Sequence, residues 1–239
     1  MSWRRHRKER PGLDERALSD TWQVASLLLD YPDDALVARV PMLRRVVGAL
    51  PEAQRLPLAE ALDSLERGDL TALQQEYVDT FDITRKCSLH LTYFTHGDTR
   101  RRGVALVEFK QAYRKAGVDF DSDVELPDHL CVVLEFGAAH DWATGWHLLT
   151  RHRVGIEVLR AGLAQRSSPW LPVVEALRTT LPRLEGDDEE ALLRLVAEGP
   201  PQEEVGLEPY AMDPRLNPRP EPADTTALLG PTIPVGAPR

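Results

Sequence analysis

Three histidines and one aspartate have the types and spacing that could support catalysis in this chain. His90 and His96 fall in one short segment, and Asp128 and His129 stand next to each other further along. Imidazole and carboxylate groups are common ligands of a catalytic zinc ion and common general bases of hydrolases. A metal-dependent helical hydrolase that uses these four residues is therefore one hypothesis for the function.

The spacing of these groups argues against that hypothesis. Structural zinc sites usually contain two short-spaced ligand pairs, and the two cysteines, Cys87 and Cys131, do not complete such a pattern. Asp128 and His129 are predicted to be neighbours in a helix, where adjacent side chains do not face each other. The sequence also has no nucleophile elbow, phosphate-binding glycine loop, metalloprotease pair or dinucleotide fingerprint. We therefore expect no catalytic residue, no enzyme activity, no bound metal, no cofactor and reduced thiols.

A glycine-flanked segment at residues 97–103 contains Arg100, Arg101 and Arg102. Arginines at a helix N-terminus attract anions, although a solvated basic turn explains the segment equally well. A third hypothesis is a helical transcription factor that binds DNA through these arginines. The charge balance does not favour it. Residues 185–239 hold 12 acidic residues and 4 arginines, so they carry −8 of the net −9. The rest of the chain is nearly neutral and lacks the basic character of a nucleic-acid-binding domain.

Aromatic residues cluster on both sides of this basic segment. Tyr77 and Phe81 fall at helical spacing, whereas Tyr93 and Phe94 lie in a predicted loop at residues 85–97. Large aromatic side chains in loops often line grooves, and a groove with an apolar floor and an acidic rim suits a basic amphipathic peptide. The candidate peptide-binding residues are Tyr77, Phe81, Tyr93, Phe94, His96, Glu108, Asp128 and His129.

Apolar residues recur at helical spacing as far as residue 195, and only residues 118–120 resemble a strand. The predicted fold class is therefore all-α, a single globular helical bundle. A helix is predicted to restart at Pro41 and another to begin after Pro57, and Asp69 is predicted to cap one. Pro127 is predicted to lie in the first turn of another helix. The apolar spacing from residue 148 to residue 163 predicts one continuous helix.

Composition divides the chain into three parts. Residues 1–12 are basic, but no apolar run follows them as an export signal requires, so we expect a flexible arm. Residues 13–198 are the predicted all-helical domain. Residues 199–239 hold 10 of the 19 prolines without an apolar period, which predicts an acidic, mostly disordered tail. No window approaches the ~18 apolar residues of a membrane-spanning helix, so a cytoplasmic protein without an integral membrane segment is expected.

Four blocks carry a resemblance to a known family through their order along the chain. They are Tyr77-Val78-Asp79-Thr80-Phe81-Asp82, Ser88-Leu89-His90-Leu91, His96-Gly97-Asp98-Thr99-Arg100-Arg101-Arg102-Gly103 and Glu125-Leu126-Pro127-Asp128-His129-Leu130. This order closely resembles the nitrate reductase molybdenum cofactor assembly chaperones of the NarJ type, within the wider family of molybdoenzyme-specific chaperones. The resemblance extends roughly from Trp22 to Leu181 and leaves both ends of the chain uncovered.

The resemblance implies a system-specific chaperone that serves nitrate assimilation. Such a protein would bind the N-terminal segment of the catalytic subunit of a respiratory nitrate reductase. It would keep that subunit competent for molybdenum cofactor insertion and complex assembly. Molybdenum cofactor delivery proteins are further implied partners, and the block at residues 125–130 would mark a functional loop.

Overall fold

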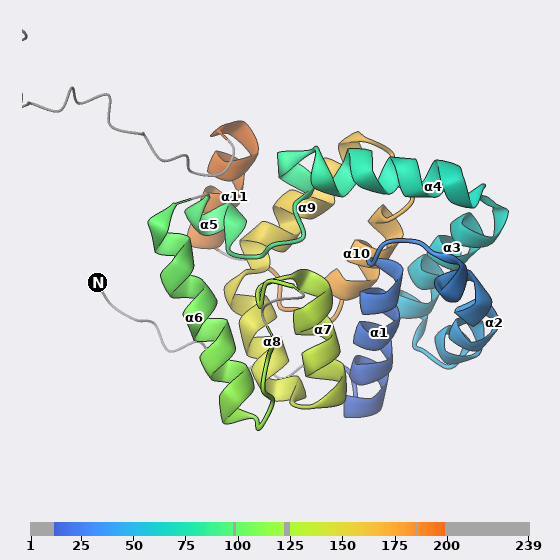
Figure 1. The fold of residues 1–239 in the computed structure, drawn as a ribbon, viewed down its shortest axis with the longest axis horizontal. Helices are drawn as coiled ribbons and strands as arrows, with labels where there is room; N and C mark the ends of the chain where they lie inside the picture. The colour runs from blue at the N-terminus through green and yellow to red at the C-terminus, as the bar shows by residue number, and fades with distance from the viewer. Residues whose placement is uncertain (1–11, 98, 122–124, 185, 199–239) are drawn as a thin grey trace, which may run out of the picture. The chain divides into compact units, whose positions relative to one another are not determined.

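The computed structural model describes residues 12–97, 99–121, 125–184 and 186–198. The chain divides into two units, Met1–Glu203 and Glu204–Arg239, and every described residue belongs to the first. The predicted tail at 199–239, and the predicted arm apart from Gly12, lie outside the described residues. Within those residues every regular element is helical and none is a strand, which confirms the all-α prediction (Figure 1).

The helices follow one another with short connections. The α-helices are α1 (Glu15–Leu28), α2 (Asp34–Gly48), α3 (Glu52–Arg67), α4 (Leu70–Tyr77), α5 (Tyr93–His96), α6 (Arg100–Lys115), α7 (Leu130–Ala139), α8 (Trp142–Arg151), α9 (Arg153–Gln165), α10 (Leu171–Arg178) and α11 (Asp187–Glu198). A wide π-helical turn, Val78–Asp82, continues α4, and a 3₁₀ turn, Arg85–Cys87, follows it.

Aspartates cap several of these helices. The backbone N–H of Ala72 donates to Asp69 Oδ1 at 2.9 Å, which confirms the predicted cap of α4. Asp14 and Asp33 accept equivalent bonds at the starts of α1 and α2. Each cap satisfies a backbone donor that the first helical turn leaves without a partner.

The predicted helix starts at Pro41 and after Pro57 are wrong. Both prolines lie inside helices, Pro41 in α2 and Pro57 in α3. A proline within a helix leaves the carbonyl four residues earlier without its donor. That residue is exposed in both helices, as Val37 and Ala53 respectively, so water can satisfy the carbonyl.

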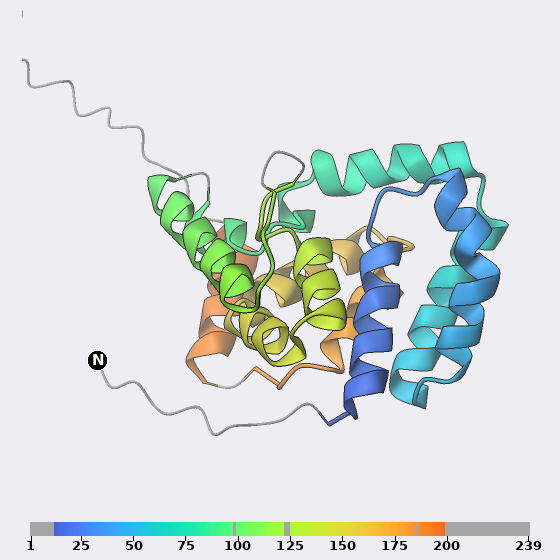
Figure 2. The same cartoon turned by 60° about the horizontal axis from the view of Figure 1, so that its bottom comes forward.

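Trp22 of α1 lies at the centre of the core and is 0% exposed. Helix α1 packs against α7, and α7 packs against α8 (Figure 2). Two glycines allow this close approach. A Cβ on Gly137 of α7 would lie 2.6 Å from the Trp22 ring, and one on Gly145 of α8 would lie 2.7 Å from the Cα of Gly137. The indole N–H of Trp22 donates to Thr180 Oγ1 at 3.0 Å, which ties α1 to the end of α10.

Two further helix boundaries differ from the sequence prediction. The predicted helix at residues 148–163 is divided at His152, whose φ of −105° and ψ of 20° leave the helical region. The apolar spacing continues across this break, so the pattern could not reveal it. Helix α7 begins at Leu130, and Pro127 and Asp128 therefore lie before the helix instead of in its first turn.

Candidate functional site

Two of the four sequence blocks meet in an antiparallel pairing. His90 and His129 form a β-bridge, and the N–H of Leu130 donates to the carbonyl of Leu89 at 2.8 Å. The N–H of Leu91 donates to the carbonyl of Asp128 at 3.1 Å. This pairing joins residues 88–92, which lead into α5, to residues 126–130, which lead into α7.

Asp128 is the polar centre of this junction and is 0% exposed. Its Oδ2 accepts hydrogen bonds from the N–H of Thr92 at 3.0 Å and from the Thr92 hydroxyl at 2.5 Å. Nδ1 of His90 lies 3.5 Å from Oδ1, and Nη2 of Arg102 lies 3.8 Å from Oδ2. Burial alone would raise the pKa of this carboxyl, but His90 and Thr92 outweigh it and hold the pKa at about 2. The carboxylate is therefore ionised, and Thr92, His90 and Arg102 surround it.

The arrangement around His129 does not resemble a catalytic centre. The rings of His90 and His129 are 5.2 Å apart in an edge-to-face contact. Burial lowers the pKa of His129, against the opposing effect of Glu125, and favours the neutral imidazole. Within the described ranges, no group of three or more His, Cys, Asp or Glu side chains could hold a metal ion. The ligands of the hydrolase hypothesis are thus not gathered into a metal site there.

The eight predicted peptide-binding residues do not share one open surface. Phe94 and Asp128 are 1% and 0% exposed, and Tyr77 and Phe81 are 8% exposed each. The remaining four are partly or fully exposed, namely Tyr93, His96, Glu108 and His129. Tyr93 and Phe94 belong to the short helix α5, so the prediction of a loop over these residues is wrong. As a binding set, the eight residues stay a prediction.

Tyr77 and Phe81 belong to a buried aromatic cluster with Trp170. Their ring centroids lie 5.5 and 5.3 Å from that of Trp170, and 4.7 Å from each other. The hydroxyl of Tyr77 donates to the carbonyl of Leu29 at 3.0 Å, next to the end of α1. Both predicted residues are therefore largely buried and pack against Trp170.

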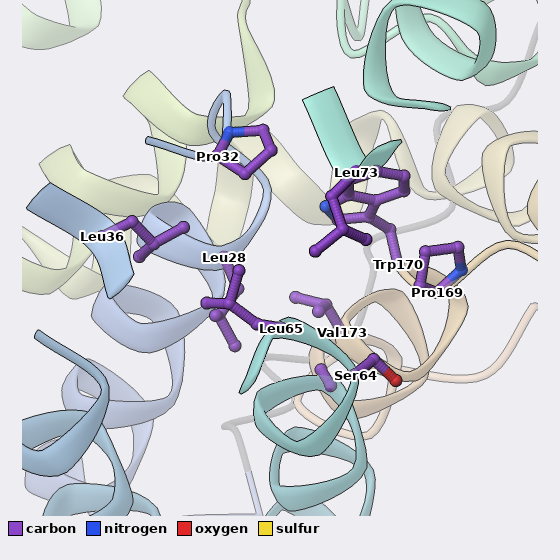
Figure 3. A pocket seen from close by; sticks show the side chains of 10 residues that line it. Leu28, Pro32, Leu36, Ser64, Leu65, Leu73, Pro169, Trp170 and Val173 are labelled. Atoms are coloured by element: carbon purple, nitrogen blue, oxygen red, sulfur yellow. The ribbon is translucent and has the colours of Figure 1, made fainter. Parts of the chain in front are cut away.

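Trp170 also lines an apolar pocket that the sequence analysis did not find. Figure 3 shows its side chains directed toward one another from α1, α2, α3, α4 and the start of α10. The enclosed space is only about 20 Å³, room for about one water molecule. The lining residues are Leu28, Pro32, Leu36, Ala61, Ser64, Leu65, Leu73, Pro169, Trp170 and Val173.

A wider hollow of about 550 Å³ adjoins this pocket and shares Ser64, Leu73 and Pro169 with it. Glu60 of α3 and Glu76 of α4 line the hollow. Together the two spaces form an apolar floor with an acidic rim. No single segment of the sequence contains this site, because its residues are distant in the chain and meet only through helix packing.

The fold defines a class, the all-helical proteins, and here the pockets lie between the helices. Residues 48–176 match the family described as the nitrate reductase delta subunit, and the chain belongs to that family. This finding confirms the resemblance to the NarJ type.

Several relatives carry names from nitrate reductase assembly. The chain is 32% identical over 157 residues to the nitrate reductase molybdenum cofactor assembly chaperone NarJ of Escherichia coli, covering 64% of this chain and 66% of that protein. It is 28% identical over 162 residues to the probable NarJ of Bacillus subtilis, covering 67% and 88%. These relatives are assembly chaperones and not catalysts, in agreement with the prediction that this chain is not an enzyme.

The chain is also similar to a longer protein and to a solved structure. The chain is 37% identical over 160 residues to the nitrate reductase-like protein NarX of Mycobacterium tuberculosis, covering 66% of this chain and 24% of that protein. The chain thus spans about a quarter of NarX. A crystal structure from Archaeoglobus fulgidus, assigned to the redox enzyme maturation proteins, has a TM-score of 0.52 at 23% identity and covers 73% of this chain and 97% of its own. That likeness concerns the fold alone. Within the described ranges no helix is long and apolar enough to cross a bilayer.

Proposed function

We propose that this protein is a maturation chaperone of a nitrate reductase. It binds the N-terminal segment of the catalytic subunit and keeps that subunit competent for molybdenum cofactor insertion. Membership of the nitrate reductase delta subunit family and the names of the NarJ relatives support the chaperone role. Molybdenum cofactor delivery proteins are the expected partners in the insertion step.

The observation that carries the binding proposal is the apolar pocket with its acidic hollow. Leucine, proline and tryptophan side chains form its floor, and apolar floors of this kind take the anchor residues of a helical peptide. Glu60 and Glu76 at the adjoining hollow favour basic residues beside those anchors. The segment expected to bind is therefore amphipathic and basic.

The narrowness of the pocket indicates how binding would proceed. A space of about 20 Å³ cannot hold a leucine side chain, so the lining helices must separate. Leu73 from the short helix α4 contributes to both spaces, and Gly68 lies just before that helix. Movement of α4 would therefore open the pocket and the hollow together.

Calorimetric titration with a synthetic peptide of the catalytic subunit's N-terminal sequence tests this proposal. Leu65→Asp places a charge in the pocket and should weaken binding more than about tenfold, as loss of an interface anchor does. Leu56 lies on the same helix but is 55% exposed and does not line the pocket, so Leu56→Asp is the matched control. Melting temperatures establish that both variants fold.

Two further variants locate the site independently of Leu65. Glu60 is exposed, so Glu60→Lys should weaken a basic peptide without unfolding the protein. Tyr93→Ala tests the placement near α5 and α6. Equal peptide affinity in wild type, Leu65→Asp and Glu60→Lys would exclude the apolar pocket, and a loss confined to Tyr93→Ala would move the site to α5.

A further inference from the structure

A second pocket, of about 620 Å³, lies among α9, α10, α11 and the connection between the last two. It shares no residue with the apolar pocket. Among the described residues, its lining contains four arginines and two glutamates. The whole chain carries −9, so this pocket is a local exception to the charge of the protein. The charged lining residues are Arg153, Arg160, Arg178, Arg183, Glu157 and Glu189.

Glu157 is the buried centre of the cluster and is 4% exposed. Its carboxylate accepts bonds from Arg153 Nη2 at 2.6 Å, Arg178 Nε at 2.7 Å and Arg160 Nε at 2.8 Å. Burial raises the pKa of Glu157, but the three guanidinium groups outweigh it and lower the pKa. The carboxylate is ionised, and three positive charges surround one buried negative charge.

Glu175 adds a second carboxylate at the edge of this cluster. It accepts from Arg160 Nη1 at 3.2 Å and from Arg178 Nη1 at 3.1 Å. The side chains of Arg160 and Arg178 remain 31% and 43% exposed. The cluster of three arginines and two glutamates has one more positive charge than negative charges.

Arg153 has a buried donor that this network does not satisfy. The residue is 4% exposed, and its Nε donates to the carbonyl of Pro182 at 3.1 Å. Its Nη1 is buried and has no hydrogen-bond partner within the described part of the chain. A buried charged donor without an acceptor costs free energy, which an entering anion would offset.

We propose that this pocket binds a small phosphate ester. A phosphate monoester carries close to two negative charges at neutral pH and a carboxylate carries one, so an arginine-rich lining favours the phosphate. Guanidinium groups bind phosphate oxygens through paired N–H donors. Leu181, Leu184 and Leu192 form apolar walls beside the arginines, where the organic part of the ester would lie.

Calorimetric titration of the full chain with phenyl phosphate tests this assignment. Benzoate has the same ring but a single charge. It should bind at least about tenfold more weakly, because it loses one charge-assisted contact. Inorganic phosphate distinguishes the source of the anion. Tighter binding of phenyl phosphate supports an ester, and tighter binding of inorganic phosphate supports the same site for the free ion.

Arg183→Gln removes an exposed lining charge that does not bind Glu157, and it should weaken phenyl phosphate about tenfold. Arg194→Gln on α11 removes an exposed arginine that does not line the pocket, and should leave the affinity unchanged. Absence of saturable binding, equal affinity for benzoate, or equal weakening by both substitutions would overturn the proposal. None of these outcomes bears on peptide binding, which uses other residues.

Discussion

Individual side chains hold the two sequence blocks at residues 88–91 and 125–130 together. Asp128 receives both donors of Thr92 and lies beside His90, so a fully buried carboxylate joins segments that lead into different helices. Tyr113 adds a bond from α6, because its hydroxyl donates to the carbonyl of Pro127 at 2.6 Å. The block at residues 125–130 is therefore a structural joint. Its hydrogen bonds connect the segment before α7 to Thr92 and to helix α6.

Asp128→Asn tests this joint through stability. Replacing the charged acceptor should lower the free energy of unfolding at pH 7 by about 2 kcal/mol, because hydrogen bonds to a charged group are weakened. Asp119 is exposed, so Asp119→Asn is the matched control and should change the free energy by less than about 0.5 kcal/mol. Urea unfolding measures both, and equal values for the two variants would contradict the role of Asp128.

The pH dependence of stability gives an independent prediction for the same carboxyl. Its pKa is about 2 in the folded protein, below the value of about 4 for an unfolded aspartate. The stabilisation is therefore fully present above about pH 4 and is lost as the pH falls toward 2, by about 2 kcal/mol in all. The difference in unfolding free energy between wild type and Asp128→Asn should shrink over that window. A difference that stays constant from pH 5 to pH 2 would show that the carboxyl has an ordinary pKa.

The functional blocks were recognisable in the sequence, but the contacts of Asp128 were not. Pro127 suggested that Asp128 lies at a helix N-terminus, whereas the carboxylate binds Thr92, 36 positions earlier. The apolar pocket shows the same limit more strongly. Leu28, Leu65 and Trp170 are distant in the sequence, and only helix packing brings them together.

At the scale of the element, close helix packing depends on small residues. Helices α7 and α8 approach each other at Gly137 and Gly145, and Trp22 of α1 fills the space beside them. The apolar period predicted helices in these regions correctly. It could not predict the break at His152, which depends on local backbone geometry. Nor could it predict that helix α2 accommodates Pro41, which depends on solvent access to a carbonyl.

A pair of glycine substitutions tests this packing. Gly145→Ala would place a Cβ 2.7 Å from the Cα of Gly137 and should lower the unfolding free energy by about 2 kcal/mol. Gly103→Ala on α6 meets nothing within 4 Å, and should raise it by about 0.5 kcal/mol because alanine favours the helix. Denaturant unfolding compares the two. A neutral Gly145→Ala would mean that α7 and α8 can separate without loss.

At the scale of the whole molecule, the described residues form one helical unit, and the two proposed binding sites lie in different parts of it. The apolar pocket joins α1, α2, α3, α4 and α10, and the arginine-lined pocket joins α9, α10 and α11. Helix α10 contributes to both. A peptide at the first site and a small anion at the second would therefore contact different residues.

Truncation after Glu198 tests whether residues 199–239 contribute to stability. Residues 199–239 are rich in proline and have no apolar period, so their removal should leave the melting temperature within a few degrees of the full chain. Calorimetry of the two proteins makes the comparison. A large fall in melting temperature would instead assign the segment a stabilising contact with the helical unit.

We propose that this chain assists the maturation of a nitrate reductase through its apolar pocket. The most direct measurement is the molybdenum content of the reductase catalytic subunit, isolated from cells that lack this protein and are complemented with wild type, Leu65→Asp or Leu56→Asp at equal levels. The account predicts full molybdenum occupancy with wild type and Leu56→Asp, and occupancy close to that of the uncomplemented cells with Leu65→Asp. Full occupancy in the uncomplemented cells would contradict the chaperone function, and full occupancy with Leu65→Asp would contradict its dependence on the pocket.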